Sequence, residues 1–153
     1  MILSGQSIRE RGIFTPFSER TKAHGMTFGV GPAGYDVRIA ETVKIPAGGF
    51  VLASTMERFV MPNDLLGIVH DKSTWARVGL ALQNTVAEPG WAGHLTLELS
   101  NHGKFAIKLL AGMPIAQIIF HLTDQPVENS YDGKYHNQKA GPQPAIFEAE
   151  QRN

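Results

Sequence analysis

The sequence predicts an all-β fold, and three observations support this prediction. Glycine and proline, 16 and 9 residues of 153, are spread along the chain and divide it into short segments, as in β-rich domains with many turns. Apolar and polar residues alternate in several of these segments, which is typical of strands with one buried face. The regular spacing of the short segments favours a sandwich, a jelly roll or a barrel.

The clearest alternating segment covers residues 94–100. Its three leucines would face the core, whereas His94, Thr96, Glu98 and Ser100 would lie on the opposite face. Further strands are expected at residues 50–54, 65–70, 105–109 and 115–122. A single short helix is expected within residues 4–11, where Ser7 and Glu10 resemble a capping box and Gly12 would end the helix.

The composition excludes several classes of partner and site. Lysine plus arginine and aspartate plus glutamate both number 14, so the zero net charge favours neither a nucleic-acid backbone nor an anionic membrane. The chain has no cysteine, so it forms no disulfide and no thiolate zinc site, and its six histidines lack the spacing of a metal site. No segment approaches the roughly 20 apolar residues of a membrane span, so we expect a cytoplasmic protein.

The chain length is that of one domain. We expect residues 1–126 to form a single β domain and residues 127–153 to form a C-terminal flap and tail. Residues 129–138 are polar and aromatic with few aliphatic side chains, so they cannot form a core of their own. They would be either a disordered end or a flap that orders over a ligand.

Residues 71–77, with the sequence D-K-S-T-W-A-R, place two cations and two hydroxyls directly after an apolar strand. Hydroxyl and backbone N–H groups are directional donors, and lysine and arginine add charge, so the segment suits a phosphate chain. The alternative is a solvated turn with a helical start after Ser73.

Glu98 is the candidate for acid/base chemistry, because a carboxylate within a leucine-rich strand faces either water or a polar cavity. In a cavity, burial would raise its pKa and an adjacent Arg77 would lower it, which suits a group that takes and returns protons. The alternative is an ordinary exposed strand residue. Asp36 and Arg38 lie on one side of another expected strand, where a structural pairing within the sheet is favoured.

Six motifs in order make the chain resemble the dCTP deaminase and dUTPase superfamily, with dCTP deaminases as the nearer group. They are A-G-Y-D-V at residues 33–37, K-S-T-W-A-R at 72–77, E-P-G-W-A-G at 88–93, L-E-L at 97–99, G-M-P-I-A-Q at 112–117 and K-Y-H-N-Q at 134–138. The resemblance implies a distorted β-barrel or jelly roll of the dUTPase type with a short N-terminal helix. It also implies a homotrimer whose sites lie between subunits, and a flap that closes on phosphates.

The activity that this resemblance implies is hydrolytic, zinc-independent deamination of dCTP to dUTP and ammonia. Glu98 would be the proton carrier, and Ser73 and Arg77 would position the water and the glutamate. The implied substrate-binding residues are Lys72, Thr74, Trp75, Asn84, Thr85, Glu88, Trp91, Thr96, Leu97, Tyr131, Lys134 and Gln138. Mg²⁺ would accompany the triphosphate, since few cations cannot neutralise about four negative charges.

Other functions remain open at the level of sequence. dUTPases carry an aspartate where this chain has Glu88, so a plain dUTPase or a bifunctional enzyme that yields dUMP is an alternative. The loop over residues 78–87 is shorter than in the bacterial deaminases that it resembles, and residues 83–86 lie where the family reads the base. A trimer that binds nucleotides such as dTTP for regulation, without turnover, is the alternative outside the enzymes.

Overall fold

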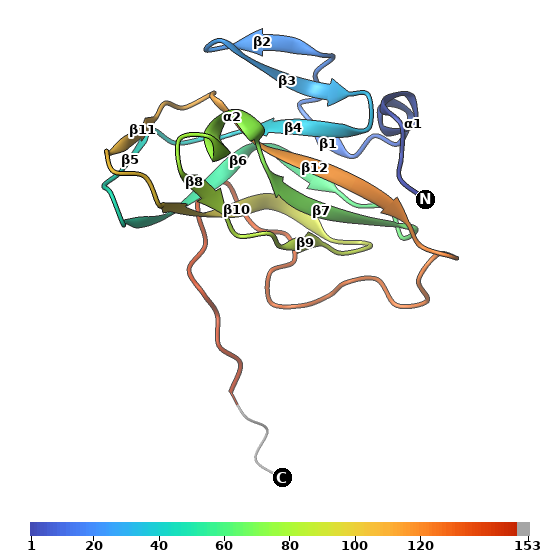
Figure 1. Cartoon of the computed structure of the whole chain (residues 1–153). Helices are drawn as coiled ribbons and strands as arrows, with labels where there is room; N and C mark the ends of the chain where they lie inside the picture. The colour runs from blue at the N-terminus through green and yellow to red at the C-terminus, as the bar shows by residue number, and fades with distance from the viewer. Residues whose placement is uncertain (150–153) are drawn as a thin grey trace.

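The computed structural model describes residues 1–149 and consists almost entirely of strands (Figure 1). Residues 150–153, the end of the expected C-terminal tail, lie outside the described residues. The strands are β1 (Phe14–Thr15), β2 (Thr21–Ala23), β3 (Met26–Gly31), β4 (Gly34–Arg38), β5 (Val43–Ile45), β6 (Phe50–Val60), β7 (Leu65–Asp71), β8 (Leu80–Leu82), β9 (Val86–Ala87), β10 (Ala92–Asn101), β11 (Ile107–Leu109) and β12 (Pro114–Leu122). Two short helices, α1 (Gly5–Glu10) and α2 (Ser73–Ala76), complete the described elements.

The strands form three sheets, and all the described strand pairs are antiparallel. One sheet has the order β1-β6-β10-β8, a larger one has the order β2-β3-β4-β12-β7-β9, and β11 pairs with β5. The core is a single cluster of buried side chains from both larger sheets, including Leu97 and Leu99 of β10, Phe59 of β6 and Phe120 of β12. This arrangement confirms the predicted all-β fold of curled sheets.

The local predictions hold for the strands, but the boundaries and one cap differ. The strand expected at residues 50–54 continues to Val60 as β6, and the one expected from residue 105 begins at Ile107. Ser4, not Ser7, caps α1: its Oγ accepts a hydrogen bond from the backbone N–H of Ser7. The predicted capping box was therefore placed three residues too late.

A bulge on β6 interrupts its pairing with β10 shortly before the candidate glutamate. His94 pairs with Arg58 and Thr96 pairs with Ser54, so the register along β6 shifts between these two rungs. Three residues of β6, 55–57, lie opposite Leu95 alone, and the strict alternation expected for residues 94–100 fails at this point. Leu95 and Thr96 are both buried as a result.

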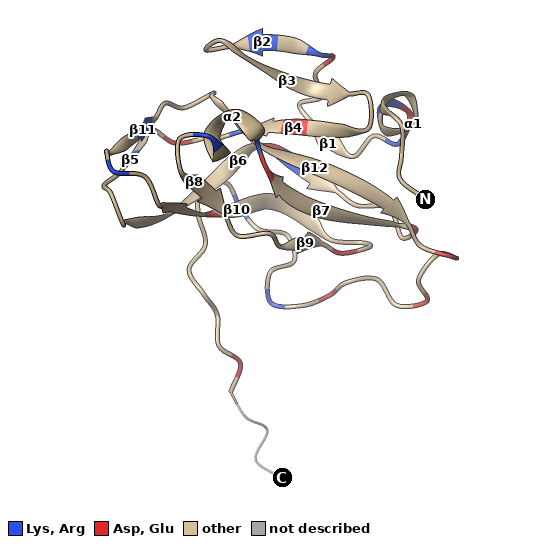
Figure 2. Cartoon of the chain, in the orientation of Figure 1, with Lys and Arg blue, Asp and Glu red and all other residues tan. Residues whose placement is uncertain are grey.

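None of the described helices is long and apolar enough to cross a membrane. In Figure 2, the basic and acidic residues are spread over the strands and the loops.

Candidate functional site

A cavity of about 690 Å³ lies between the β6–β10 sheet, the turn before β10 and the C-terminal segment. β10 contributes Leu95, Thr96 and Glu98, and β6 contributes Phe50 and Leu52. The pairing of β10 with β6 explains this set, because Glu98 lies opposite Leu52 and Ser100 lies opposite Phe50. The volume is within the usual range for small-molecule sites.

Glu98 is the chemically distinctive residue of this cavity. Its Oε2 atom is buried, and none of the described residues donates a hydrogen bond to it. Burial raises the pKa of the Glu98 carboxyl above its ordinary value of 4.5, because the charged form loses hydration. A desolvated carboxyl with one oxygen to which no described residue donates is suited to exchange protons with a bound ligand.

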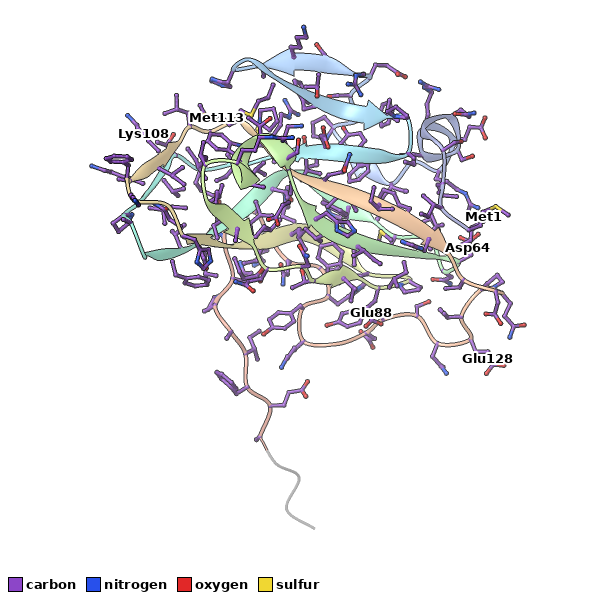
Figure 3. All side chains as sticks on the ribbon, viewed as in Figure 1. Met1, Asp64, Glu88, Lys108, Met113 and Glu128 are labelled. Atoms are coloured by element: carbon purple, nitrogen blue, oxygen red, sulfur yellow. The ribbon has the colours of Figure 1, made fainter. Side chains whose placement is uncertain are left out.

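The turn before β10 forms one wall of the cavity and carries Glu88 and Trp91. The backbone N–H of Trp91 donates to the carbonyl of Glu88 across the turn at 3.0 Å, and Gly90 has a φ of 81°. Figure 3 shows Glu88 beside the C-terminal segment. Glu88 is exposed, whereas Glu98 is half-buried, so the two carboxylates of the cavity differ in their access to water.

The C-terminal segment is tied to this turn by main-chain and side-chain hydrogen bonds. The indole N–H of Trp91 donates to the Tyr135 carbonyl at 2.7 Å, and the backbone N–H of Tyr131 donates to the Pro89 carbonyl at 2.9 Å. Gln138 forms a parallel bridge with Gly93. The predicted flap residues therefore lie in an ordered position against the cavity.

Thr96 connects the floor of the cavity to the chain that follows Gln138. Its Oγ1 accepts a hydrogen bond from the backbone N–H of Gln143 at 3.0 Å and donates to Gln138 Oε1 at 3.3 Å. Residues 143–145 line the cavity as well. The C-terminal segment thus covers the cavity over a longer stretch than the predicted flap contacts alone.

The structure brings together eight of the residues singled out from sequence. These cavity-lining residues are Asn84, Thr85, Glu88, Trp91, Thr96, Glu98, Tyr131 and Gln138. Phe50, Leu52, Tyr135 and Gln143 were missed. Phe50 and Leu52 could have been found from the alternation of residues 50–54, had the pairing of this strand with β10 been known. Tyr135 lies within the K-Y-H-N-Q motif. No local signal marks Gln143.

Other predicted residues lie outside the cavity of their own chain. The side chain of Leu97 is fully buried in the core, on the other side of β10, so it does not line the cavity. Lys134 is exposed, with its Nζ 5.3 Å from the centre of the Tyr135 ring. The cavity lining holds no lysine or arginine within the described part of the chain.

The segment 72–77 lies apart from the cavity. In Figure 1, α2 lies above β8 and β10, whereas the C-terminal segment runs below β9 and β10. Ser73, Thr74 and Arg77 are exposed, and the Arg77 guanidinium donates to the Ser73 carbonyl at 2.9 Å. Within one chain, Arg77 therefore does not lie beside Glu98.

Lys72 and Trp75 of this segment have protein partners instead. Lys72 Nζ lies 2.7 Å from Asp36 Oδ2, and the Trp75 indole N–H donates to the Pro114 carbonyl at 2.7 Å. Arg38, the other charged residue of β4, pairs with the buried Glu57 at 2.8 Å. The pairing of Asp36 and Arg38 within their sheet is therefore not observed, because Lys72 precedes α2 and Glu57 lies in β6 of the other large sheet.

No group of three or more histidine, aspartate or glutamate side chains is arranged to hold a metal ion among the described residues. The two carboxylates of the cavity could contact a metal only together with ligand oxygens. A divalent cation that arrives on a polyphosphate fits these residues, because phosphate oxygens and water would supply its other ligands.

The sequence of this chain is similar to those of a family of known proteins. The family model described as dCTP deaminase-like matches residues 36–123, more than half of the chain. A dCTP deaminase from Campylobacter hominis is 35% identical over 180 aligned positions, which cover 96% of this chain and 94% of that protein. The alignment is longer than the 153-residue chain, so the relative contains segments that this chain lacks.

Solved structures share the fold at lower identity. The native EIAV dUTPase has a TM-score of 0.59 and 22% identity, and the match covers 80% of this chain and 97% of that one. A mutant dUTPase from phage phi11 of S. aureus, described as coordinating a structural Mg(II) ion, has a TM-score of 0.58 and 15% identity, with 76% and 91% of the two chains covered. The fold is therefore of the dUTPase type, and by its sequence the chain belongs to the dCTP deaminase-like family.

Proposed function

We propose that this chain deaminates dCTP hydrolytically, to dUTP and ammonia, without zinc. The observation that supports the proposal best is the buried, unpartnered Oε2 of Glu98 in a nucleotide-sized cavity of a dCTP deaminase-like chain. Glu98 accepts a proton from water as the water oxygen bonds to C4 of cytosine, and it delivers a proton to N3. Glu98 then transfers the proton of the new C4 hydroxyl to the amine, the C4–N4 bond breaks, and ammonia leaves while a C4 carbonyl remains.

The phosphate groups of the substrate require positive charge that one chain does not supply at its cavity. The cavity lining contains two residues of a charged type, Glu88 and Glu98, and both are acidic. We propose that a neighbouring subunit of a homotrimer presents its Ser73, Thr74 and Arg77 to this cavity. Their exposure on α2 of the isolated chain supports this arrangement, because it leaves all three side chains accessible to a partner.

The remaining contacts in this proposal come from the turn and the flap. Asn84 and Thr85 read the base and Trp91 packs against the nucleoside, while Tyr131, Lys134 and Gln138 close over the phosphates. Lys72 is part of the phosphate subsite only as a nearby charge, since Asp36 already pairs with it. Mg²⁺ is bound by the triphosphate oxygens and lowers the negative charge that the protein must meet.

The first test incubates the purified protein with dCTP and Mg²⁺ and measures ammonia and uracil nucleotides. Wild-type protein should release ammonia, and Glu98→Gln should reduce the rate by about 10² to 10⁴, because the amide keeps the shape and cannot carry the proton. Arg9→Ala, on the exposed face of α1, is the matched control and should leave the rate unchanged. Full ammonia release by Glu98→Gln would refute the mechanism.

The second test addresses the shared site. Glu98→Gln and Arg77→Ala should each be nearly inactive alone. After the two variants are unfolded together and refolded as a mixture, about a quarter of the sites should combine an intact Glu98 with an intact Arg77 from the neighbouring chain. Recovery of activity in the mixture is expected, and its absence alongside recovery in a refolded wild-type control would exclude a site shared between subunits.

A bifunctional enzyme that also hydrolyses dUTP is the second candidate. The exposed carboxylate of Glu88 at the cavity wall supports it, because such a group can activate water for attack on a phosphate. Pyrophosphate release from dUTP by the wild type, reduced in Glu88→Gln, is the distinguishing result. Ammonia-free pyrophosphate release would indicate a plain dUTPase, and nucleotide binding without either product would indicate a regulatory trimer.

In this proposal, residues 1–126 form the β domain and residues 127–153 form the flap and tail. The protein is cytoplasmic, because its substrate is small and charged. Fractionation of the native cells with detection of the protein tests the location. Limited proteolysis with and without dCTP tests the boundary, since cleavage after residue 126 should be suppressed by the nucleotide.

A further inference from the structure

Helix α2 is too short to fix its own orientation. It has four residues, and its closing hydrogen bonds run from Ala76 N to the Lys72 carbonyl at 3.1 Å and from Arg77 N to the Ser73 carbonyl at 3.3 Å. A single helical turn has little stability in isolation. Contacts with the rest of the protein must therefore set the direction in which its side chains point.

Trp75 provides the contact from within the helix. It is the one residue of the four that is not exposed, and it packs against the core cluster. Its indole N–H donates to the carbonyl of Pro114, the first residue of β12, at 2.7 Å. Packing holds the Trp75 ring in place, and the hydrogen bond fixes the direction in which the indole N–H points.

The spacing along the helix connects Trp75 to the two residues proposed to act on the substrate. Ser73 and Arg77 are four positions apart, so they lie on one face of the turn. Trp75 lies two positions from each of them, which places it on the opposite face. Any rotation of α2 about its axis would then move Ser73 and Arg77 together, and the bond of Trp75 to Pro114 opposes that rotation.

We propose that Trp75 is a positioning residue, whose indole N–H, held by the Pro114 carbonyl, sets the orientation of Ser73 and Arg77 toward the nucleotide. This inference rests on the proposed function, in which Ser73 and Arg77 position the water and the glutamate. It differs from the role that the sequence suggested for Trp75, because the indole acts through its neighbours and does not contact the substrate. Lys72 holds the start of the same helix through Asp36.

The decisive experiment replaces the indole N–H alone. Site-specific incorporation of benzothienylalanine at position 75 keeps the shape of the ring system and substitutes sulfur for the N–H. We expect kcat for ammonia release from dCTP to fall about tenfold, the size expected for one lost hydrogen bond. KM should change less than kcat, because the phosphate contacts of the flap remain, and the melting temperature should stay close to that of the wild type.

Two further variants separate positioning from general stability. Trp75→Phe removes the N–H and part of the ring, so it should lower kcat at least as much as benzothienylalanine and also lower the melting temperature. Ile8→Val, a small loss of buried volume in α1, should lower the melting temperature without changing kcat. A benzothienylalanine protein with wild-type kcat would overturn the inference.

The same measurements distinguish a failure of the proposed function. If the wild-type protein releases no ammonia from dCTP, the proposed function is refuted, and the inference is refuted with it. If the wild type is active and the benzothienylalanine protein loses kcat only in proportion to its folded fraction, the function stands and the positioning role is refuted. A loss of kcat with an unchanged folded fraction supports both.

Discussion

Lys72 and Asp36 form an ion pair in which both side chains are largely removed from water. Lys72 Nζ lies 2.7 Å from Asp36 Oδ2, and the two side chains are only 10% and 15% exposed. The second carboxylate oxygen of Asp36 is buried without a hydrogen-bond partner among the described residues. The pair joins the residue before α2 to β4, across 36 positions of sequence.

Removal of one partner of this pair should be more harmful than removal of both. Asp36→Asn leaves the Lys72 ammonium buried without compensation, and we expect the free energy of unfolding to fall by about 3–5 kcal/mol. The double variant Asp36→Asn with Lys72→Met removes both charges, so it should be more stable than Asp36→Asn alone. Urea denaturation of the wild type, both single variants and the double variant measures the coupling.

If the losses of unfolding free energy in the two single variants add up to the loss in the double variant, the charges do not interact in solution. Arg11, whose Nη1 lies 2.8 Å from the carboxylate of the more accessible Asp64, offers a matched control. Arg11→Met should cost about 1 kcal/mol or less, because a solvated pair contributes little to stability.

The raised pKa of Glu98 predicts a pH dependence of stability. An acid whose pKa is higher in the folded state binds protons more tightly there, so the stabilisation is fully present below the ordinary value of 4.5. It is lost as the pH rises through the folded-state pKa. Relative to the wild type, Glu98→Gln should therefore become progressively more stable as the pH is raised from about 4 to about 7.

Denaturant unfolding of wild type and Glu98→Gln at several pH values measures this difference. If the difference in unfolding free energy does not vary with pH, Glu98 is hydrated in solution. The proposed mechanism, which requires a desolvated carboxyl at this position, would then be contradicted.

The sequence predicted the fold well, because alternation and turns are local properties. The leucines of residues 94–100 and the glycines and prolines between strands are visible without knowledge of tertiary contacts. The bulge after His94 was not predictable, since it depends on the pairing of β10 with β6. It explains why Leu95, expected on the core face, also lines the cavity.

The candidate site was predicted less completely than the fold. Glu98 was found as a carboxylate within a leucine-rich strand, and the turn that contains Trp91 was found because its motif resembles that of a known family. Phe50 and Leu52 join the site through strand register, and Gln143 joins it through a hydrogen bond to Thr96, 47 positions away. The partners of Lys72 and Trp75 are equally non-local, so the sequence showed these residues as free binding groups.

Thr96 should control how firmly the C-terminal segment covers the cavity. Thr96→Val keeps the branched shape and removes the Oγ1 that accepts from Gln143 N. We expect faster amide exchange at Gln143, and a KM for dCTP raised by about three- to tenfold, from the loss of one to two modest hydrogen bonds. Thr55→Ser, which keeps the hydroxyl bonded to the backbone N–H of Leu95, is the control and should leave amide exchange at Gln143 unchanged.

Gly93, the second residue of β10, should not tolerate a side chain. A Cβ at this position would lie 2.6 Å from the backbone N of Gln138, and its φ of 142° disfavours other residues. Gly93→Ala should therefore displace the residues around Gln138 and reduce kcat/KM for dCTP by at least tenfold. Gly48→Ala separates backbone strain from the contact with Gln138. Gly48 also has a positive φ, of 73°, but a Cβ there would meet nothing within 4 Å. Both variants should lose about 1–2 kcal/mol of stability through backbone strain, whereas only Gly93→Ala should lose activity. Equal kinetics for the two variants would show that the contact of Gly93 with Gln138 does not contribute to catalysis.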